Sequence, residues 1–292
     1  MSDSIYKIIT DRITALLEEG VVPWQKSWNA NQQPPQNLVS RKQYRGINIL
    51  LLHSMGYASP YWLTFKQALA LGGHVKQGQK GCPVIFWRWM EVENKETGKI
   101  EQIPLMRYFT VFNLTQCEGI PIPAAAEPAK EHSPIQEAEA IVAGMPHRPE
   151  INNGLNRAVY SPLSDTVGMP SPETFKSAEA YYSVLFHELT HSTGHESRLN
   201  RKGVSRTEGK LAAFGSGSDP YAKEELVAEM GAAFLCGQAG IVERTMDNSA
   251  AYIASWLQRL KNDPKLVVQA AGQAQKAADY ILAKNEQTAH CE

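Results

Sequence analysis

The sequence predicts an α+β protein of two domains, a small mixed α/β domain followed by a second domain whose C-terminal part is largely helical. Segments with strand-like patterns lie in the first half, whereas the second half has long stretches with helical spacing of apolar residues. Between them, residues 118–133 are rich in Pro and Ala and lack periodicity, which is typical of a linker. The predicted domains therefore span residues 1–117 and 134–292.

The composition indicates a globular protein, because the 292 residues are 43% hydrophobic and 20% charged. No apolar run is long enough for a membrane span, and the N-terminus has no signal-peptide pattern. The four Cys are scattered without C-x-x-C pairing, so neither a disulfide framework nor a zinc ribbon is indicated. We expect a cytoplasmic protein that contacts no membrane, and a monomer is favoured.

The first half is expected to contain a helix followed by a buried element and a hairpin. In order, these are a helix over Tyr6–Glu19, a buried helix or strand over Ile47–Leu52, and strands over Val84–Met90 and Met106–Asn113 with a turn at Lys95–Lys99.

The second half begins with a short strand over Ala158–Pro162, which is either an edge strand for an extended peptide or a plain sheet edge. A helix starting at Ser171 or Ser177 should end near Gly194. A second helix is expected over Tyr221–Leu235, and the small residues that follow Glu229 favour close packing of this helix against another. Residues 250–282 then predict two helices joined near Asp263-Pro264.

The first of these helices carries His187-Glu188-Leu189-Thr190-His191. Residues four apart share a helix face, so His187 and His191 can both bind one ion. Glu188 then lies close to the ion without binding it, which is the position of a general base for hydrolysis. The pattern favours one Zn²⁺ per chain, with Mn²⁺ or another divalent cation as the alternative.

This motif resembles that of the zincins, and zincins of the gluzincin type use a Glu as third ligand. By this resemblance Glu225 is the third ligand, and Glu229 supports a ligand His from behind; the reverse assignment stays open. Glu224 is expected on a solvated face. His195 is interpreted as a pocket or structural residue. The stabiliser of a developing oxyanion is left open among four residues, Tyr160, Tyr252, Arg198 and His195.

Charge and aromatic residues are unevenly distributed along the chain. Residues 1–115 have 13 Lys and Arg against 8 Asp and Glu, a net charge of +5, and the remainder carries −6. Five of the six Trp also lie in this first part, interleaved with basic residues. Aromatic faces beside cations are how proteins hold single-stranded nucleic acid.

Three aromatic residues in polar or Pro- and Gly-broken stretches are candidates for base stacking, namely Trp24, Trp28 and Tyr44. Five basic residues are candidates for phosphate contacts, namely Arg41, Lys42, Arg45, Lys76 and Lys80. The competing interpretation is that the aromatics form a core, as expected for Trp62 and Phe65.

The order of motifs resembles the ArdC-type antirestriction proteins over about residues 4–285. The first half contains Gly20-Val21-Val22-Pro23-Trp24, Tyr44-Arg45-Gly46-Ile47-Asn48, Trp62-Leu63-Thr64-Phe65-Lys66-Gln67 and Gly72-Gly73-His74-Val75-Lys76-Gln77-Gly78. The second half contains Tyr160, Asp165, His187-Glu188-x-x-His191, Thr193-Gly194-His195, Arg198-Leu199-Asn200-Arg201 and Glu224-Glu225-Leu226-Val227-Ala228-Glu229.

The resemblance implies an N-terminal single-stranded-DNA-binding domain and a C-terminal zincin-like, gluzincin-type metallopeptidase domain. Such proteins travel with conjugative plasmids and help incoming DNA escape restriction, here by cleaving an unknown host protein. One alternative is a strand-coating protein whose zincin domain is only structural, and another is a metal-dependent nuclease. Mimicry of DNA by an acidic surface does not suit a basic first half.

Overall fold

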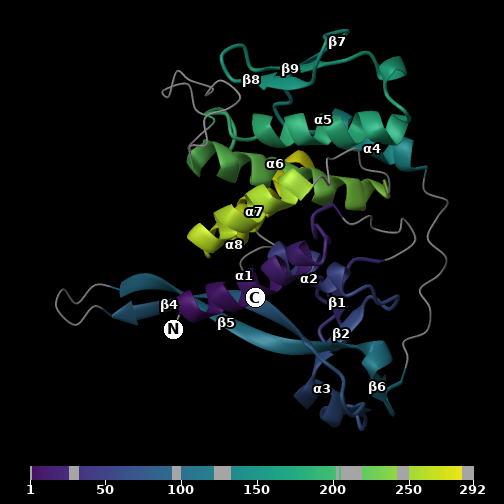
Figure 1. Ribbon diagram of the computed structural model, residues 1–292, viewed down its shortest axis with the longest axis vertical. Coiled ribbons are helices and arrows are strands. Elements are labelled where there is room, and N and C mark those ends of the chain that lie inside the picture. The colour runs from purple at the N-terminus through teal and green to yellow at the C-terminus, as the bar shows by residue number, and fades with distance from the viewer. Residues whose placement is uncertain are drawn as a thin grey trace.

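The structure is a computed structural model that describes residues 2–25, 33–93, 100–121, 133–201, 204, 219–241 and 250–284. The stranded first half and the helical second half lie one above the other in Figure 1, with α1 (Ser2–Glu18) and α2 (Ile47–Ser54) between them. No helix in these ranges is long and apolar enough to cross a membrane.

The first half is built on a four-stranded sheet of order β1-β2-β5-β4. Its strands are β1 (Gln36–Asn37), β2 (Tyr61–Thr64), β4 (Cys82–Glu93) and β5 (Ile100–Asn113), and only the β1–β2 pair is parallel. A capping box of Thr64 and Gln67 starts α3 (Phe65–Ala70) directly after β2. β3 (His74–Val75) pairs with β6 (Cys117–Glu118), and a 3-10 turn, Leu114–Gln116, precedes β6.

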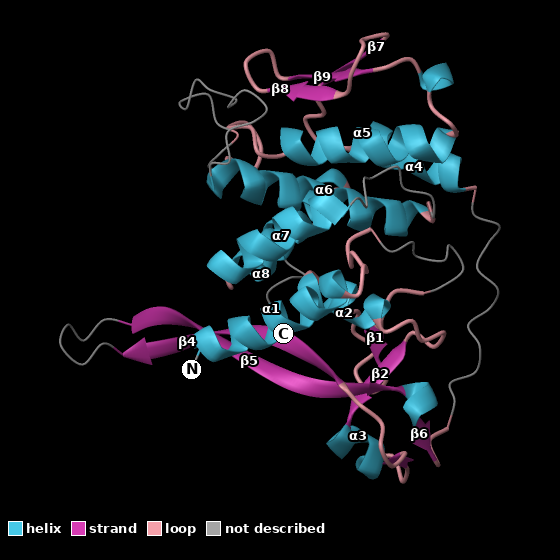
Figure 2. Cartoon of the chain, viewed as in Figure 1, coloured by secondary structure: helices cyan, strands magenta, loops and turns pink. Residues whose placement is uncertain are grey.

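The second half has a three-stranded sheet of order β7-β9-β8 above a group of helices, as Figure 2 shows. The strands are β7 (Glu150–Asn153), β8 (Val159–Ser161) and β9 (Thr166–Met169), with a 3-10 turn at Pro172–Thr174. The helices are α4 (Pro134–Gly144), α5 (Ala178–Ser192), α6 (Asp219–Ala239), α7 (Ala250–Asn262) and α8 (Leu266–Ile281). β8 is an edge strand, as expected.

One cluster of buried apolar side chains runs through both halves. It includes Ile9 of α1 and Leu50 of α2 together with Phe186 of α5, Leu226 of α6 and Val267 of α8, all fully buried. Polar contacts also join the two halves: Thr10 Oγ1 donates to the carbonyl of Pro264 at 2.6 Å, and Gly46 N donates to Gln275 Oε1 at 2.9 Å. The described parts of the two halves therefore share a core.

The expected elements of both halves are confirmed, and Ile47–Leu52 is helical. The expected turn at Lys95–Lys99 lies outside the described residues, as does most of the expected linker, residues 122–132. The domain boundaries stay a prediction. The five described positions of that linker include Glu118, which pairs with His74 as part of β6.

Candidate metal centre

Helix α5 is set by its capping residues. Ser177 Oγ accepts the backbone N–H of Ala180 at 3.2 Å, so Ser177 is the N-cap of the two that the sequence offered. After the last helical residue, the chain turns sharply past Gly194. A Cβ on Gly194 would lie 2.7 Å from Val204 Cγ2, so only glycine permits this close approach. The turn returns the chain across the end of α5.

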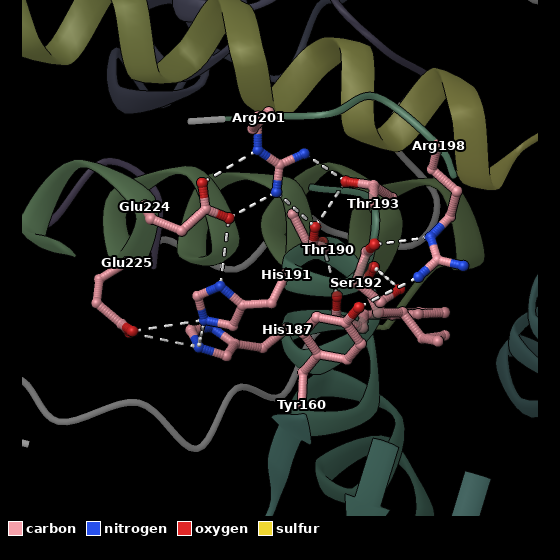
Figure 3. A network of polar contacts seen from close by, with 12 residues as sticks. Tyr160, His187, Thr190, His191, Ser192, Thr193, Arg198, Arg201, Glu224 and Glu225 are labelled. Carbon is pink, nitrogen blue, oxygen red and sulfur yellow. Dashed lines mark hydrogen bonds and ion pairs between the residues drawn. The ribbon is translucent and has the colours of Figure 1, made fainter. Parts of the chain in front are cut away.

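Helices α5 and α6 pack in close contact at a second glycine. A Cβ on Gly231 of α6 would lie 2.4 Å from Thr190 Cγ2 of α5. The small residues after Glu229 were expected to allow such packing, and they do. The approach brings Glu225 of α6 towards His187 and His191 of α5 (Figure 3).

His187, His191 and Glu225 converge on one point. The Nε2 atoms of the two imidazoles are 3.1 Å apart, and the Glu225 oxygens lie 3.6 Å from His187 Nε2 and 3.5 Å from His191 Nε2. One potential ligand atom from each residue lies within 4.8 Å of the others. Among the described residues no group bonds the buried Nδ1 of His187, so no hydrogen bond at that nitrogen fixes the orientation of the ring.

This donor set fits a divalent cation. Two imidazole nitrogens 3.1 Å apart can share a hydrogen bond only if one of them carries a proton, whereas a divalent cation accepts a lone pair from both. Two His and one carboxylate are also the ligands of many catalytic zinc sites, which keep one open position. Glu188, the expected base, is 8% exposed, and its charge acts on His191.

Glu224 was expected on a solvated face, and this expectation is wrong. Its side chain is buried, with Oε1 3.3 Å from His191 Nδ1. The guanidinium of Arg201 donates to both of its oxygens, at 3.0 and 2.5 Å. Burial works against the charge on Glu224, but His191 and Arg201 outweigh it and hold the pKa of this carboxyl below its ordinary value.

The same contacts act on His191. Burial disfavours its protonated form, but the hydrogen bond with Glu224 and the charges of Glu225, Glu224 and Glu188 outweigh burial and raise its pKa to about 9. The carboxylate at Nδ1 leaves Nε2 as the nitrogen that faces the cluster. Glu224 thus contacts the outer nitrogen of His191, which is the role of an acid that supports a metal-binding His.

Glu229 was expected to fill that role, which is a second correction. Its Oε2 accepts hydrogen bonds from Trp24 Nε1 at 2.8 Å and from the hydroxyl of Tyr252. Burial raises the pKa of Glu229 despite these donors. Glu225 is thus the acid that the fold places with the imidazoles.

The four candidates for an oxyanion stabiliser are all held by other groups. Tyr252 donates to Glu229. Tyr160 donates to Asp165 Oδ1 at 2.8 Å, and Arg198 donates to both oxygens of Asp165. Arg198 also donates to the carbonyl of Ser192 (Figure 3). His195, buried and outside the cluster, has its Nδ1 2.8 Å from Ser197 Oγ, in agreement with a structural role.

The candidates for DNA binding fare differently. Trp24 is fully buried and Tyr44 is 5% exposed, so neither offers a face to a base, and their assignment as stacking residues is wrong. Trp28 lies outside the described residues. Arg45 pairs with Asp279 of α8, and Lys76 Nζ donates to the carbonyl of Thr115 at 3.2 Å.

Arg41, Lys42 and Lys80 are exposed, as phosphate contacts require. Arg41 has a positive φ of 61° and lies over the ring of Tyr61, 5.1 Å from its centroid.

The contact at Gly231 predicts a large effect of one methyl group. We expect Gly231→Ala to destabilise the fold by about 1–3 kcal/mol, because the buried side chain of Thr190 must give way. Cation affinity should fall as well, because the ligands sit on both helices. Gly272→Ala is the matched control, since its Cβ meets nothing within 4 Å and Ala favours helix by about 0.5–1 kcal/mol. Equal unfolding free energies for the two variants would contradict tight packing at Gly231.

Two family models match the chain. One, described as the N-terminal domain of anti-restriction factor ArdC, covers residues 3–112, and the other, a zincin-like metallopeptidase, covers residues 136–273. Among solved structures, the metal-free antirestriction ArdC protein from the R388 plasmid is 38% identical with a TM-score of 0.71, covering 98% of both chains. Its Mn(II)-bound structure gives 36% identity and a TM-score of 0.70, covering 95% of this chain and 97% of that one.

The similarity extends to longer proteins. Two Escherichia coli proteins named DNA primase TraC are 35% and 34% identical over 94% and 95% of this chain, which spans only 27% and 20% of their lengths. The uncharacterized protein y4eC of Sinorhizobium fredii is 34% identical, over 96% of this chain and 92% of its own length. The chain therefore belongs to the ArdC family, with an ArdC-type N-terminal domain followed by a zincin-like metallopeptidase domain.

Proposed function

We propose that the chain is an antirestriction protein of a conjugative plasmid or another mobile element, protecting incoming DNA in a recipient cell. The support is its similarity, over 98% of both chains, to the antirestriction protein from the R388 plasmid. Two activities would serve this role. The first half binds single-stranded DNA, and the second half cleaves a host protein in a cation-dependent reaction.

A transfer assay tests the proposed role. A plasmid with or without the gene is moved into recipients that carry or lack a restriction system. Loss of the gene should lower transfer into the restricting recipient and leave transfer into the other unchanged. Equal transfer of the two plasmids into the restricting recipient would remove antirestriction as the function.

The observation that carries the hydrolytic part is the convergence of His187, His191 and Glu225, with Glu188 next in sequence to the first of them. When bound there, a divalent cation supplies Lewis acidity that brings the pKa of a water molecule towards neutrality. Glu188 serves as the base that takes a proton and returns it to the leaving amine. Glu224 keeps His191 oriented during these steps.

We infer that zinc is the cation, at one per chain, because the ligand set is that of catalytic zinc sites. Manganese is the alternative, supported by the Mn(II)-bound structure of the R388 protein. Metal analysis of protein purified without added cations should find one zinc per chain. Manganese alone at that stoichiometry would replace zinc in the proposal.

We place the binding of single-stranded DNA on one face of the four-stranded sheet, and not at the stretch around Trp24. Arg107 and Phe109 are two residues apart on β5 and therefore share one face. Arg107 is exposed, and Phe109 is 43% exposed, with its ring centroid 5.5 Å from that of Phe86. An exposed ring beside a guanidinium offers stacking to a base and a contact to a phosphate.

Variants of β5 test this face. Phe109→Ala should weaken binding of single-stranded DNA by about 1–3 kcal/mol, the worth of one stacked base. Arg107→Ala should reduce the dependence of log affinity on log salt concentration by about one unit. Tyr108→Ala is the matched control, since Tyr108 lies between them, is 47% exposed and points to the opposite face. If only Tyr108→Ala weakens DNA binding, the single-stranded DNA binds the opposite face of the sheet.

A further inference from the structure

A buried contact joins the first half of the chain to the surroundings of the metal centre. Trp24 lies in the turn after α1, and its indole N–H donates to Glu229 Oε2 at 2.8 Å across 205 residues of sequence. The hydroxyl of Tyr252, from α7, donates to the same oxygen and lies 3.1 Å from the indole nitrogen. Trp24 is fully buried and Glu229 is 8% exposed, so solvent contributes little to holding this carboxylate.

The carboxylate of Glu229 lies beside the centre without joining it. Glu229 follows Glu225 by one helical turn on α6, and its charge interacts with those of both His187 and Glu225. The cluster of possible ligands contains Glu225 and not Glu229. A buried anion held by two donors at this position favours a nearby cation through its charge, without occupying a coordination position.

Burial alone would favour the neutral form of the Glu229 carboxyl group. Two hydrogen bonds to one oxygen oppose that tendency, because bonds to an ionised acceptor are stronger than bonds to a neutral one. One of the two donors, Trp24, belongs to the first half of the chain, within the segment matched by the ArdC N-terminal model at residues 3–112. The other lies on α7, which also packs against α1.

We propose that Trp24 and Tyr252 are positioning residues that hold Glu229 as an anion beside the centre, so that the first half of the chain sets the cation affinity of the second. The proposal rests on the proposed cation site at His187, His191 and Glu225. By linkage, occupation of the site also strengthens the attachment of the Trp24 segment to the helices. Trp24, which the sequence pattern made a candidate for stacking on DNA bases, has a different role in this proposal, because it supports the metal centre.

The experiment measures the affinity of the metal-free full-length chain for Zn²⁺ and Mn²⁺ by calorimetric titration. Trp24→Phe and Tyr252→Phe each delete one donor, and Glu229→Gln deletes the charge while keeping an acceptor. Each should weaken cation binding by about tenfold or more, the usual effect of losing a group that supports a metal site. The melting temperature of each metal-free variant reports any separate structural damage.

Two controls repeat the same chemical changes elsewhere. Trp62→Phe removes an indole that is equally buried, in β2 against Tyr57. Tyr181→Phe removes a hydroxyl that donates to Asn153 at 3.0 Å, on the helix that carries the two His. Both controls should bind cations within twofold of the wild type. They separate a specific effect on the centre from a general loss of packing.

The outcomes are distinct. Wild-type affinity in both Trp24→Phe and Tyr252→Phe would overturn the coupling, and so would an equal loss in the controls. Tighter cation binding in these variants would also overturn the coupling. It would mean that the Glu229 carboxylate binds the cation directly once its hydrogen-bond donors are removed. If Trp24→Phe does not fold, Tyr252→Phe and Glu229→Gln decide. No cation binding by the wild type would instead remove the proposed centre itself.

Discussion

Replacing Glu188 by Gln should lower the rate of peptide hydrolysis by about 10²–10⁴-fold, the usual contribution of a positioned general base. Gln has the same shape, but its neutral amide cannot accept a proton. Cation binding should be retained, because Glu188 is not among the residues that converge on the ion site. Rates on labelled casein and on a mixed peptide library, with metal content determined for each sample, provide the measurement.

Glu179→Gln is the control for this variant, since it removes a carboxylate from the first turn of the same helix. It should leave the rate within about twofold. If Glu188→Gln keeps the wild-type rate, Glu188 is not the base. If hydrolysis stops but the plasmid still escapes restriction, protection comes from coating the strand, and the peptidase has another role.

Replacing Arg201 by Met should lower the free energy of unfolding by about 3–5 kcal/mol, the usual cost of leaving one partner of a buried ion pair uncompensated. The carboxylate of Glu224 would keep only His191 as a charged neighbour among its present contacts. Arg201 also donates to Thr193 Oγ1 and to the carbonyl of Thr190, so the end of α5 should loosen. Denaturant unfolding of the metal-free protein measures the loss.

A double variant separates charge from packing at this ion pair. Arg201→Met with Glu224→Leu removes both charges and should recover part of the lost stability. The cation affinity of the double variant should be lower than that of the wild type, because His191 has lost the carboxylate at its Nδ1. The exposed pair of Lys7 and Asp11 is the control, and Lys7→Met should cost about 0–1 kcal/mol. If Arg201→Met costs no more stability than Lys7→Met, the buried ion pair contributes no more to the free energy of unfolding than a surface contact.

The parts of the site that local spacing controls could be predicted from the sequence. The four-residue interval of His187 and His191 gives a shared helix face whatever the rest of the fold does. The small residues after Glu229 likewise pointed to close helix packing, which occurs at Gly231. The strand β8 also follows from a local pattern, whereas the sequence left the N-cap of α5 open between Ser171 and Ser177.

The errors concern contacts between residues distant in sequence. Trp24 stands in a polar, Pro-broken stretch that suggests a surface, but its partner Glu229 is 205 residues away. Glu224 looks like one more acid in a charged run, and only the return of the chain past Gly194 brings Arg201 to it. Arg201 could have indicated a partner for this acid, because it is one of two Arg in a short motif just after α5. Phe65, expected in the core, is 50% exposed because it starts the short helix α3 at the surface.

The central claim is that His187, His191 and Glu225 together hold one divalent cation. The most direct measurement is calorimetric titration of metal-free wild type and of Glu225→Gln with Zn²⁺ and Mn²⁺. We predict one site per chain in the wild type, and binding weakened by at least tenfold in Glu225→Gln, which removes the negative charge of the side chain and keeps its length. Wild-type affinity in Glu225→Gln, or no binding in either protein, would contradict the claim.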